Sequence, residues 1–262
     1  MPGEFAGKVV VVTGGSRGIG RAIAEAFAGE GATMVLAASS AANLAAAADA
    51  IKKNGAAEPM TCAGDLRQLD ACQQLFKTVS ERHGRCDILV NSAGATRAGS
   101  FLDLPDEVWT DGFALKFIGA VRLCRLFWPM LKAAQGHVVN VIGGAARTPE
   151  PDFLVGSSVN GAMSTFSKGL SQLGKRDGVN VNAIHPGTTE TERTTRLWAQ
   201  RAQASGKTVE EIREQILARS GIRSIAQPED IAALALFLCS ERARQIQGVA
   251  VAVDGGGTPG VY

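Results

Sequence analysis

Aromatic residues are scarce in this chain, and tyrosine is almost absent. Phe, Trp and Tyr make up 5% of the 262 residues, and the one Tyr is Tyr262, the last residue. A tyrosine hydroxyl inside the fold, one of the side chains that can act as a general acid, is therefore excluded. Long hydrophobic runs are also missing, since 231–239 is one of the longest and a membrane-spanning helix needs about 20 residues. The sequence predicts no association with a membrane.

Neither sign of charge dominates, and cysteine is sparse. The 27 Lys and Arg face 25 Asp and Glu, a net charge of +2, so no basic face for nucleic acid is expected. The five cysteines are scattered, odd in number and never in C-x-x-C spacing. That pattern is typical of reduced, buried thiols rather than of a disulfide framework or a metal site. With no apolar signal segment in "MPGEFAGK", we expect a cytoplasmic protein without a metal ion.

Short apolar runs alternate with helix-length segments along the whole chain. Seven runs are predicted to be buried strands: 8–14, 33–39, 57–65, 86–94, 136–143, 178–187 and 248–256. Those rich in Val and Ile carry hydrophobic residues at consecutive positions, as parallel strands covered on both faces do. The sequence therefore predicts one α/β domain, residues 1–262, with a doubly wound, parallel, seven-stranded sheet and helices on both faces.

Residues 188–222 interrupt this alternation. The segment is polar, has helical patterning and follows directly after a predicted strand. Insertions at that point of an α/β domain lie over the ligand-binding edge of the sheet. We interpret it as a substrate lid.

A glycine-rich turn, "TGGSRGIG" at 13–20, joins the first predicted strand to the first predicted helix. Gly14, Gly18 and Gly20 let the backbone turn tightly and approach a pyrophosphate, whose charge the amides of the helix N-terminus can meet. Because the turn lies in the required strand–turn–helix context, it predicts a dinucleotide site.

Five motifs in order resemble those of the short-chain dehydrogenase/reductase (SDR) family: "TGGSRGIG", "GDL" at 64–66, "NSAG" at 91–94, "HPGTTET" at 185–191 and "VDGGG" at 253–257. The likeness covers nearly the whole chain. It implies a Rossmann-type fold and hydride transfer between a nicotinamide cofactor and a carbonyl or alcohol substrate. By this resemblance the cofactor would be bound by Gly14, Ser16, Arg17, Ile19, Gly20, Ser39, Asp65, Leu66, Asn91, Ala93, Gly94, Pro186, Gly187 and Thr191. For Asn91, a structural role tying neighbouring strands together is the alternative.

The end of the second predicted strand indicates which nucleotide is bound. Selection of NAD usually needs a carboxylate there, but Ser39 and Ser40 occupy this place. Arg17 is a nearby cation that could pair with a 2′-phosphate, unless it is only a solvated loop residue. The sequence favours NADP(H) over NAD(H).

The resemblance also implies four catalytic side chains: an Asn, a Ser, a Tyr and a Lys four residues after the Tyr. Aligned on "VVNVIGGAA" at 138–146 and on the motifs that follow, these positions hold Lys116, Gly143, Gly156 and Asn160. All four are substituted, so this chain departs from the family at the positions that would carry its acid–base chemistry.

Three residues are candidates to replace that chemistry. Lys116, if buried, would have its pKa lowered towards neutrality and could donate a proton, although it could equally hold a water molecule or form an ion pair. His185 would titrate near physiological pH, or else be a packed residue at a strand end. Asn160 could bind the ribose, but it is a poor proton donor.

Two functions remain open. The first is a divergent NADP(H)-dependent oxidoreductase with a small-molecule substrate; Arg147, Phe153, Leu154 and Trp198 are its predicted pocket walls. The second is a catalytically inactive, nucleotide-binding pseudoenzyme that acts as a sensor or as the partner subunit of an active relative. The intact glycine turn fits both.

The resemblance further implies a homo-oligomer, a dimer or a tetramer. The expected contacts are the faces of two long helices, about 106–134 and 157–176. Val251 and the C-terminal "TPGVY" are expected to contribute as well.

Overall fold

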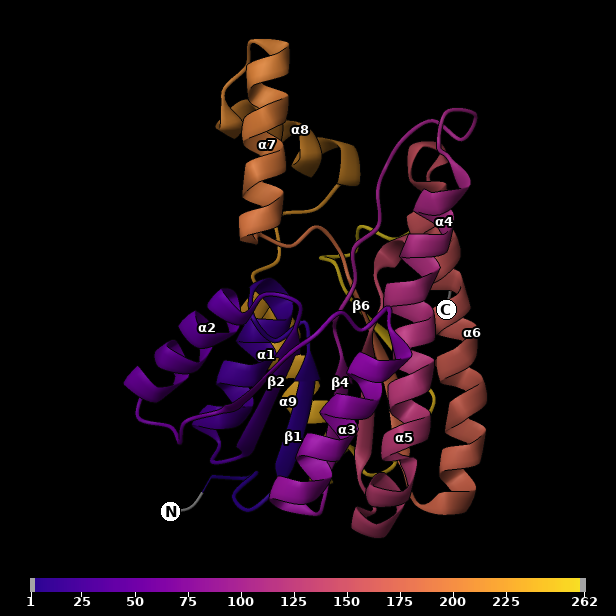
Figure 1. The fold of residues 1–262 in the computed structure, drawn as a ribbon. Helices are drawn as coiled ribbons and strands as arrows, with labels where there is room; N and C mark the ends of the chain where they lie inside the picture. Colours follow the sequence, from indigo (N-terminus) through magenta and orange to yellow (C-terminus); the bar gives the residue numbers. More distant parts are fainter. Residues whose placement is uncertain (1–2, 260–262) are drawn as a thin grey trace.

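The computed structural model describes residues 3–259. At its centre lies a parallel sheet of seven strands, in the order β3-β2-β1-β4-β5-β6-β7. The strands are β1 (Val9–Thr13), β2 (Thr33–Ala38), β3 (Met60–Ala63), β4 (Ile88–Asn91), β5 (His137–Val141), β6 (Asn180–Pro186) and β7 (Ala250–Val253). The chain winds outward from β1 in one direction and from β4 in the other (Figure 1). The predicted doubly wound α/β domain is confirmed.

Consecutive valines make β1 a central strand. Val9 and Val11 point to one face of the sheet and Val10 and Val12 to the other, because side chains alternate along a strand. Val10 and Val12 pack into one hydrophobic cluster with Phe27, whereas Val9 and Val11 pack into a second cluster on the opposite face. A strand buried on both faces therefore needs apolar residues at every position, which is the pattern that the sequence shows.

Helices cover both faces (Figure 1). Residues of α1 (Gly18–Gly29), α2 (Ala41–Lys53) and α9 (Pro228–Leu238) fill the first cluster. Residues of α3 (Leu69–His83) and α5 (Gly119–Ala134) fill the second, with α6 (Leu154–Asp177) packed against it.

The predicted long helix 106–134 is divided. It begins as α4 (Asp106–Phe113), widens into a π-helical turn over Ala114–Ile118 and continues as α5. A π turn inserts one extra residue into a helical turn, and such turns are frequent at functional sites. Lys116 lies in the middle of this one.

The segment predicted as an insertion forms α7 (Glu192–Ser205) and α8 (Val209–Ser220), which stand beyond the carboxyl ends of the strands (Figure 1). Trp198, Ala202, Ile212 and Ile225 give the pair a small core of its own. Trp198 is 3% exposed there, so its prediction as a pocket wall is wrong: it packs inside the helix pair.

Within residues 3–259, no helix is both long enough and apolar enough to cross a bilayer. Residues 260–262, which include Tyr262 and the end of the predicted contact segment "TPGVY", lie outside the described residues.

Candidate active site

The glycine turn leaves an anion site open at the start of α1. Gly14 (φ +67°) and Gly18 (φ +53°) adopt left-handed conformations that favour glycine. At Gly20, a β-carbon would lie 2.4 Å from the carbonyl oxygen of Gly14. No side chain caps α1 at Arg17, so the free N–H groups of the first turn and the helix dipole are available to a ligand. The turn fits the diphosphate of a dinucleotide.

The loop after β4 packs directly against this turn. The hydroxyl of Thr13 accepts hydrogen bonds from the backbone N–H groups of Ser92 and Ala93, both at 3.1 Å. A β-carbon on Gly14 would lie 3.0 Å from the backbone of Ala93. The side chain of Asn91 is buried and donates to Oδ1 of Asn140 at 2.9 Å, so it ties β4 to β5. This is the structural role given above as its alternative.

Two serine hydroxyl groups follow the end of β2, and the glycine turn carries the cation of Arg17. Ser39 and Arg17 are exposed, and within residues 3–259 Arg17 takes part in no ion pair. The hydroxyl of Ser40 accepts a hydrogen bond from the N–H of Asn43 and so caps α2. Ser39 and Arg17 are therefore the side chains available to an anionic group beside the glycine turn.

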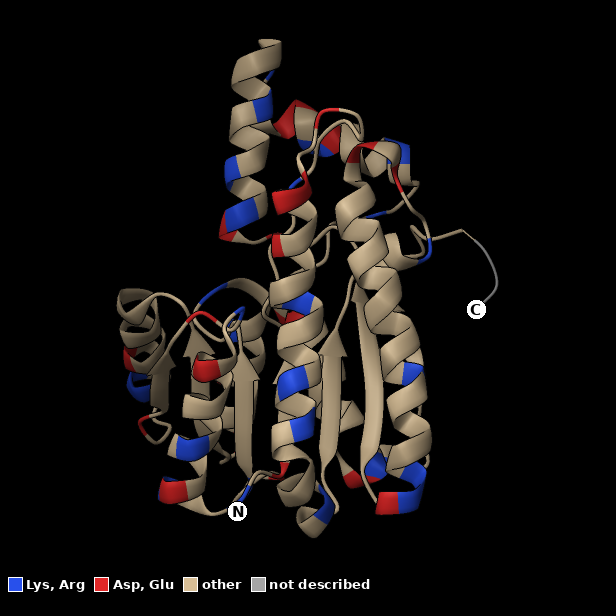
Figure 2. Ribbon diagram, turned by 45° about the vertical axis from the view of Figure 1, so that its right-hand side comes forward, with Lys and Arg blue, Asp and Glu red and all other residues tan. Residues whose placement is uncertain are grey.

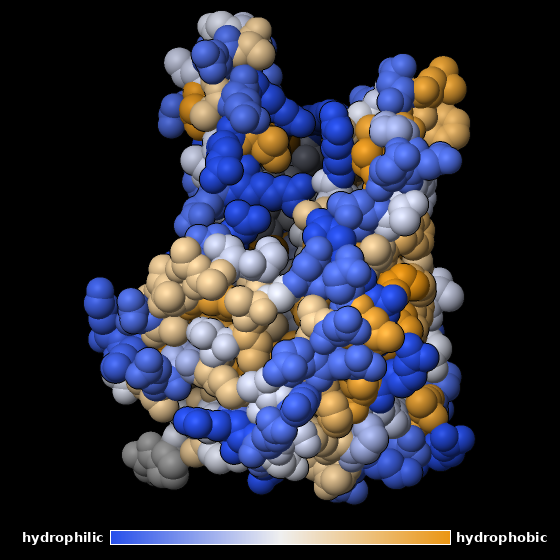
Figure 3. Space-filling model, viewed as in Figure 1, coloured by the Kyte–Doolittle hydropathy of each residue, from blue (hydrophilic) through white to orange (hydrophobic). Residues whose placement is uncertain are grey.

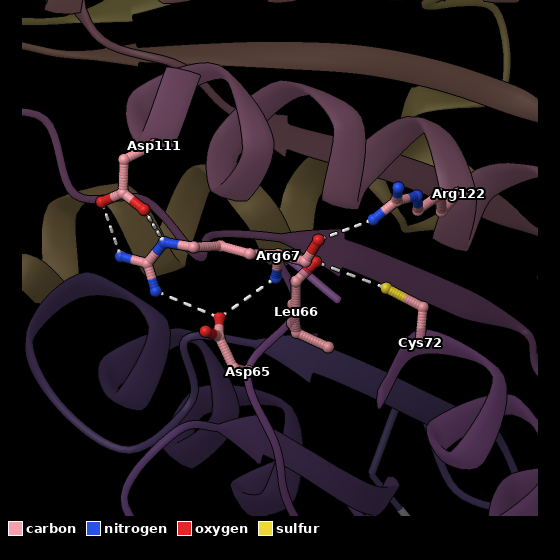
Figure 4. Close-up of polar contacts among 6 residues, drawn as sticks. All are labelled: Asp65, Leu66, Arg67, Cys72, Asp111 and Arg122. Carbon is pink, nitrogen blue, oxygen red and sulfur yellow. Dashed lines mark hydrogen bonds and ion pairs between the residues drawn. The ribbon is translucent and has the colours of Figure 1, made fainter. Parts of the chain in front are cut away.

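Asp65 is held by a residue that the sequence analysis missed. The guanidinium of Arg67 bridges Asp65 (Nη1–Oδ1 3.0 Å) and Asp111 of α4 (Nε–Oδ1 2.5 Å), as Figure 4 shows. Arg122 of α5 donates to the carbonyl of Arg67 at 2.7 Å, and the thiol of Cys72 donates to the carbonyl of Leu66. The 65–67 loop is thus fixed to three helices.

Lys116 projects from the π turn to the carboxyl end of β5. Its Nζ donates a hydrogen bond to the carbonyl of Ile142, and a β-carbon on Gly94 would lie 3.0 Å from its Cδ. Burial, assisted by the charge of Arg193, lowers the pKa of Lys116 to about 8. An ammonium group with this pKa can exchange its proton near neutral pH.

His185 does not titrate near physiological pH as expected. It is 1% exposed, and burial, assisted by the charges of Arg147 and Lys116, lowers its pKa to about 4, against the opposing effect of Asp254. Its Nε2 lies 3.2 Å from the hydroxyl of Ser164. His185 is therefore a neutral, packed side chain, the alternative given above.

Gly143 and Asn160 lie against each other. Gly143 has φ +126°, a conformation that L side chains rarely adopt. A β-carbon there would lie 3.2 Å from Nδ2 of Asn160. Asn160 is 5% exposed, and its Oδ1 is buried without a hydrogen-bond partner within residues 3–259. Oδ1 of Asn160 is thus an unsatisfied hydrogen-bond acceptor beside Gly143, which follows β5.

The ring of Phe153 occupies the space beside Gly156. A β-carbon on Gly156 would lie 2.1 Å from both Cε1 and Cζ of that ring. Gly156 is buried in the first turn of α6, and Phe153 directly precedes this helix. Any side chain at position 156 therefore needs the ring to move.

The base of α7 closes the arrangement. Thr191 caps this helix, accepting from the N–H of Thr194, and a β-carbon on Gly18 would lie 3.4 Å from its methyl group. Arg193 donates to the carbonyl of Thr96 at 3.1 Å. A β-carbon on Gly187, which follows Pro186 at the end of β6, would lie 2.6 Å from Asp254. The α7 base thus contacts both the glycine turn and the loop after β4.

Known proteins with the same architecture now identify the family. A family model described as short chain dehydrogenase matches residues 8–202. The chain belongs to the short-chain dehydrogenase/reductase family. Meso-2,3-butanediol dehydrogenase of Serratia marcescens is 30% identical to it over 97% of this chain and 96% of that enzyme. L-fucose dehydrogenase of Rattus norvegicus is 32% identical over 91% of this chain and 85% of that enzyme.

A solved structure extends the likeness to three dimensions. L-sorbose reductase from Gluconobacter frateurii, complexed with NADPH and L-sorbose, matches this chain with a TM-score of 0.95. The match covers 100% of both chains at 32% sequence identity.

In this SDR chain the glycine turn, Lys116, Asn160 and the base of α7 all gather at the carboxyl edge of the sheet. Ligands of open α/β sheets bind at that edge, where the strand order reverses. Figure 3 shows a hollow there, bordered mainly by hydrophilic residues, between α7 and α8 on one side and the loop above α4 on the other. Within residues 3–259, no three His, Cys, Asp or Glu side chains gather into a metal site.

Proposed function

We propose that this SDR protein is an NADP(H)-dependent oxidoreductase that interconverts a carbonyl compound and an alcohol, with Lys116 as its proton donor and acceptor. The observation that carries the proposal is the ammonium group of the half-buried Lys116. It lies at the carboxyl edge of the sheet, has a pKa of about 8, and is hydrogen-bonded to a neutral carbonyl.

The residues present fit NADP(H). The uncapped first turn of α1 would bind the diphosphate, and Arg17 with Ser39 would bind the 2′-phosphate in place of the carboxylate that selects NAD. Asp65 and Leu66 would border the adenine, residues 91–94 the ribose, and Pro186, Gly187 and Thr191 the nicotinamide. The G. frateurii L-sorbose reductase was solved with NADPH, which supports this choice. When bound, NADPH supplies a hydride ion to the carbonyl carbon and becomes NADP⁺.

Lys116 completes the reaction on the substrate oxygen. In reduction, the π bond of the carbonyl breaks, its oxygen takes a proton from the ammonium, and the amine left behind regains a proton from water. In oxidation, the neutral amine takes the hydroxyl proton. General acid–base catalysis of this kind contributes about 10²- to 10⁴-fold to a rate. The unpartnered Oδ1 of Asn160 would accept a hydrogen bond from a hydroxyl of the ribose or the substrate.

Residues 188–222 would act as the lid over this site. Their first helix contacts the glycine turn through Thr191 and the loop after β4 through Arg193. A change in either contact would alter access to Lys116.

A second candidate is the pseudoenzyme, which binds the nucleotide without turnover. Gly143, Gly156 and Asn160 supply no hydroxyl group to the substrate oxygen, and the ring of Phe153 fills the space at position 156. These residues favour an inactive site if Lys116 does not transfer a proton to the substrate.

The test combines turnover with binding. NADPH consumption would be followed with a panel of ketones and aldehydes, for the wild type, Lys116→Met and the control Lys168→Met. Lys168 also donates to a backbone carbonyl, that of Gly248, but lies away from the site. We expect Lys116→Met to lower kcat about 10²- to 10⁴-fold and to abolish the pH dependence centred near 8. NADPH affinity measured by calorimetry should stay unchanged.

Three outcomes separate the candidates. Full activity in Lys116→Met would refute the role of Lys116. An equal loss in Lys168→Met would indicate a general structural effect. Tight NADPH binding with no turnover of any substrate would favour the pseudoenzyme.

A further inference from the structure

Several acidic residues around the mouth of the site are engaged with other groups, whereas Glu192 is exposed and forms no ion pair within residues 3–259. Glu190 pairs with Arg213 at 2.6 Å, Glu150 lies 4.0 Å from Arg219, and Asp111 pairs with Arg67. The carboxylate of Asp254 accepts hydrogen bonds from the N–H groups of Gly256 and Thr258, both at 2.9 Å. The engaged acids therefore have little charge left to offer a cation.

Two cations at the same place have only neutral partners. Lys116 donates to the carbonyl of Ile142, and Arg193 donates to the carbonyl of Thr96. Within residues 3–259, neither cation takes part in an ion pair, and Glu192, next to Arg193 in the sequence, forms none with it. Apart from burial, Arg193 is the one influence that acts on the pKa of Lys116, and no carboxylate opposes it.

The charge of Arg193 reaches Lys116, since it lowers the pKa of that side chain. Arg193 is the second residue of α7. Thr96 lies two residues after Gly94, in the loop that follows β4. The chain of Lys116 lies against Gly94, so the Arg193–Thr96 hydrogen bond spans the site beside it. Figure 2 shows further basic residues along the lower part of α7. Basic side chains of α7 thus lie beside the place where a substrate would enter, together with Glu192 at the start of the helix.

A bound anion would supply the negative charge that Lys116 and Arg193 lack. Lys116 is half-buried and bears a desolvation cost without a counter-ion, whereas Arg193 is exposed and open to a ligand from solvent. A carboxylate would supply negative charge to both. The planar fork of an arginine matches a carboxylate through two parallel hydrogen bonds. Nη2 of Arg193 donates to the carbonyl of Thr96. The other N–H groups of the guanidinium remain for such a ligand.

We propose that the substrate is a carbonyl compound that also carries a carboxylate, and that Arg193 binds this carboxylate while Lys116 faces the carbonyl oxygen. In reduction the substrate is an oxo acid, and in oxidation it is the corresponding hydroxy acid. The assignment of the carbonyl to Lys116 rests on the proposed function, whereas the binding of the carboxylate by Arg193 does not.

The first experiment compares matched substrates. Short 2-oxo and 3-oxo acids and their methyl esters would be assayed with NADPH for the wild type, Arg193→Gln, Arg193→Lys and the control Arg196→Gln. Arg196 is an exposed arginine of the same helix. We expect the acids to exceed their esters at least tenfold in kcat/KM. Arg193→Gln should lower kcat/KM for the acids about 10- to 100-fold, mainly through KM, as for loss of a charged hydrogen bond, with the esters unchanged. Arg193→Lys should recover part of the loss.

The second experiment does not need turnover. Binding of oxamate, an unreactive carboxylate that resembles a 2-oxo acid, would be measured by calorimetry in the presence of NADP⁺. Arg193→Gln should weaken it about 10- to 100-fold, and Arg196→Gln should not.

The outcomes distinguish this inference from the proposed function. Turnover of esters or neutral ketones as efficient as that of oxo acids would overturn the inference and leave the oxidoreductase standing. Oxamate binding that depends on Arg193, without turnover of any carbonyl compound, would support the carboxylate site and refute the oxidoreductase. Oxamate binding that is absent or insensitive to Arg193→Gln would overturn the carboxylate site.

Discussion

A single methyl group at position 156 tests the packing of the site. A helical Gly→Ala substitution usually stabilises a protein by up to about 1 kcal/mol. At Gly156, however, the new β-carbon would lie 2.1 Å from Cε1 and Cζ of Phe153, so the ring must leave its position. Overpacking of this kind costs about 1–3 kcal/mol. We expect Gly156→Ala to lower the free energy of unfolding by up to about 2 kcal/mol, the overpacking cost less a propensity gain of about 1 kcal/mol.

The same helix supplies matched controls. At Gly161 and Gly169 of α6, a β-carbon would meet nothing within 4 Å. Alanine at these positions gains the helical propensity without the contact, so both variants should be stabilised by up to about 1 kcal/mol. Gly156→Ala should therefore be less stable than either control by about 2 kcal/mol.

Urea unfolding followed by circular dichroism, at one fixed protein concentration, measures these differences. Removing the ring with Phe153→Ala should make Gly156→Ala stabilising, which gives a double-mutant coupling energy of about 1–3 kcal/mol. If Gly156→Ala stabilises the wild type as much as Gly161→Ala does, the ring does not occupy this space and the reasoning is refuted.

Three further predictions follow from charge and surface. The pKa of Lys116 falls from 10.5 to about 8 on folding, so the unfolded chain binds more protons between these values. Stability relative to Lys116→Met should therefore rise between pH 8 and 10.5, by roughly 3 kcal/mol at about 1.4 kcal/mol per pKa unit; parallel urea-unfolding profiles would contradict this. NADPH should bind more tightly than NADH, and Arg17→Ala should reduce the preference in calorimetric titrations; equal affinities in the wild type would exclude a 2′-phosphate site. Light scattering at micromolar concentration should give a dimer or a tetramer, and a monomer would refute the expected helix contacts.

The central strands β1, β2 and β4 could be predicted from the sequence because they are short, mostly apolar and buried on both faces. The glycine turn was equally visible, since its conformations need glycine at fixed positions. The locations of the strands and of the glycine turn depend on local sequence, together with the rule that apolar residues are buried. Helices α7 and α8 were predicted for a related reason, since their segment is a polar interruption of a regular alternation.

Other features depend on residues far apart in the chain. Arg67 bridges Asp65 and Asp111, which are 46 positions apart, and nothing near Arg67 distinguishes it from a solvated arginine. The low pKa of His185 results from burial and from Arg147 and Lys116, which other elements bring close to it. The π turn around Lys116 has no clear mark in its sequence, "ALKFI".

The residues that replace the family's catalytic side chains pack against one another. Their packing bears on whether the site still catalyses a reaction. The ring of Phe153 fills the space that Gly156 leaves, and Asn160 lies against Gly143. A pocket that had only lost its function could be packed equally well with apolar side chains. This one instead retains the ammonium group of the half-buried Lys116 without an acidic partner, and an amide oxygen of Asn160 without a donor. Both reduce the stability of the folded state. Binding of the nucleotide would offset the cost at Asn160 through a ribose hydroxyl, but not the cost at Lys116, because the diphosphate would lie at the start of α1. A substrate whose oxygen meets Lys116 would offset the cost there.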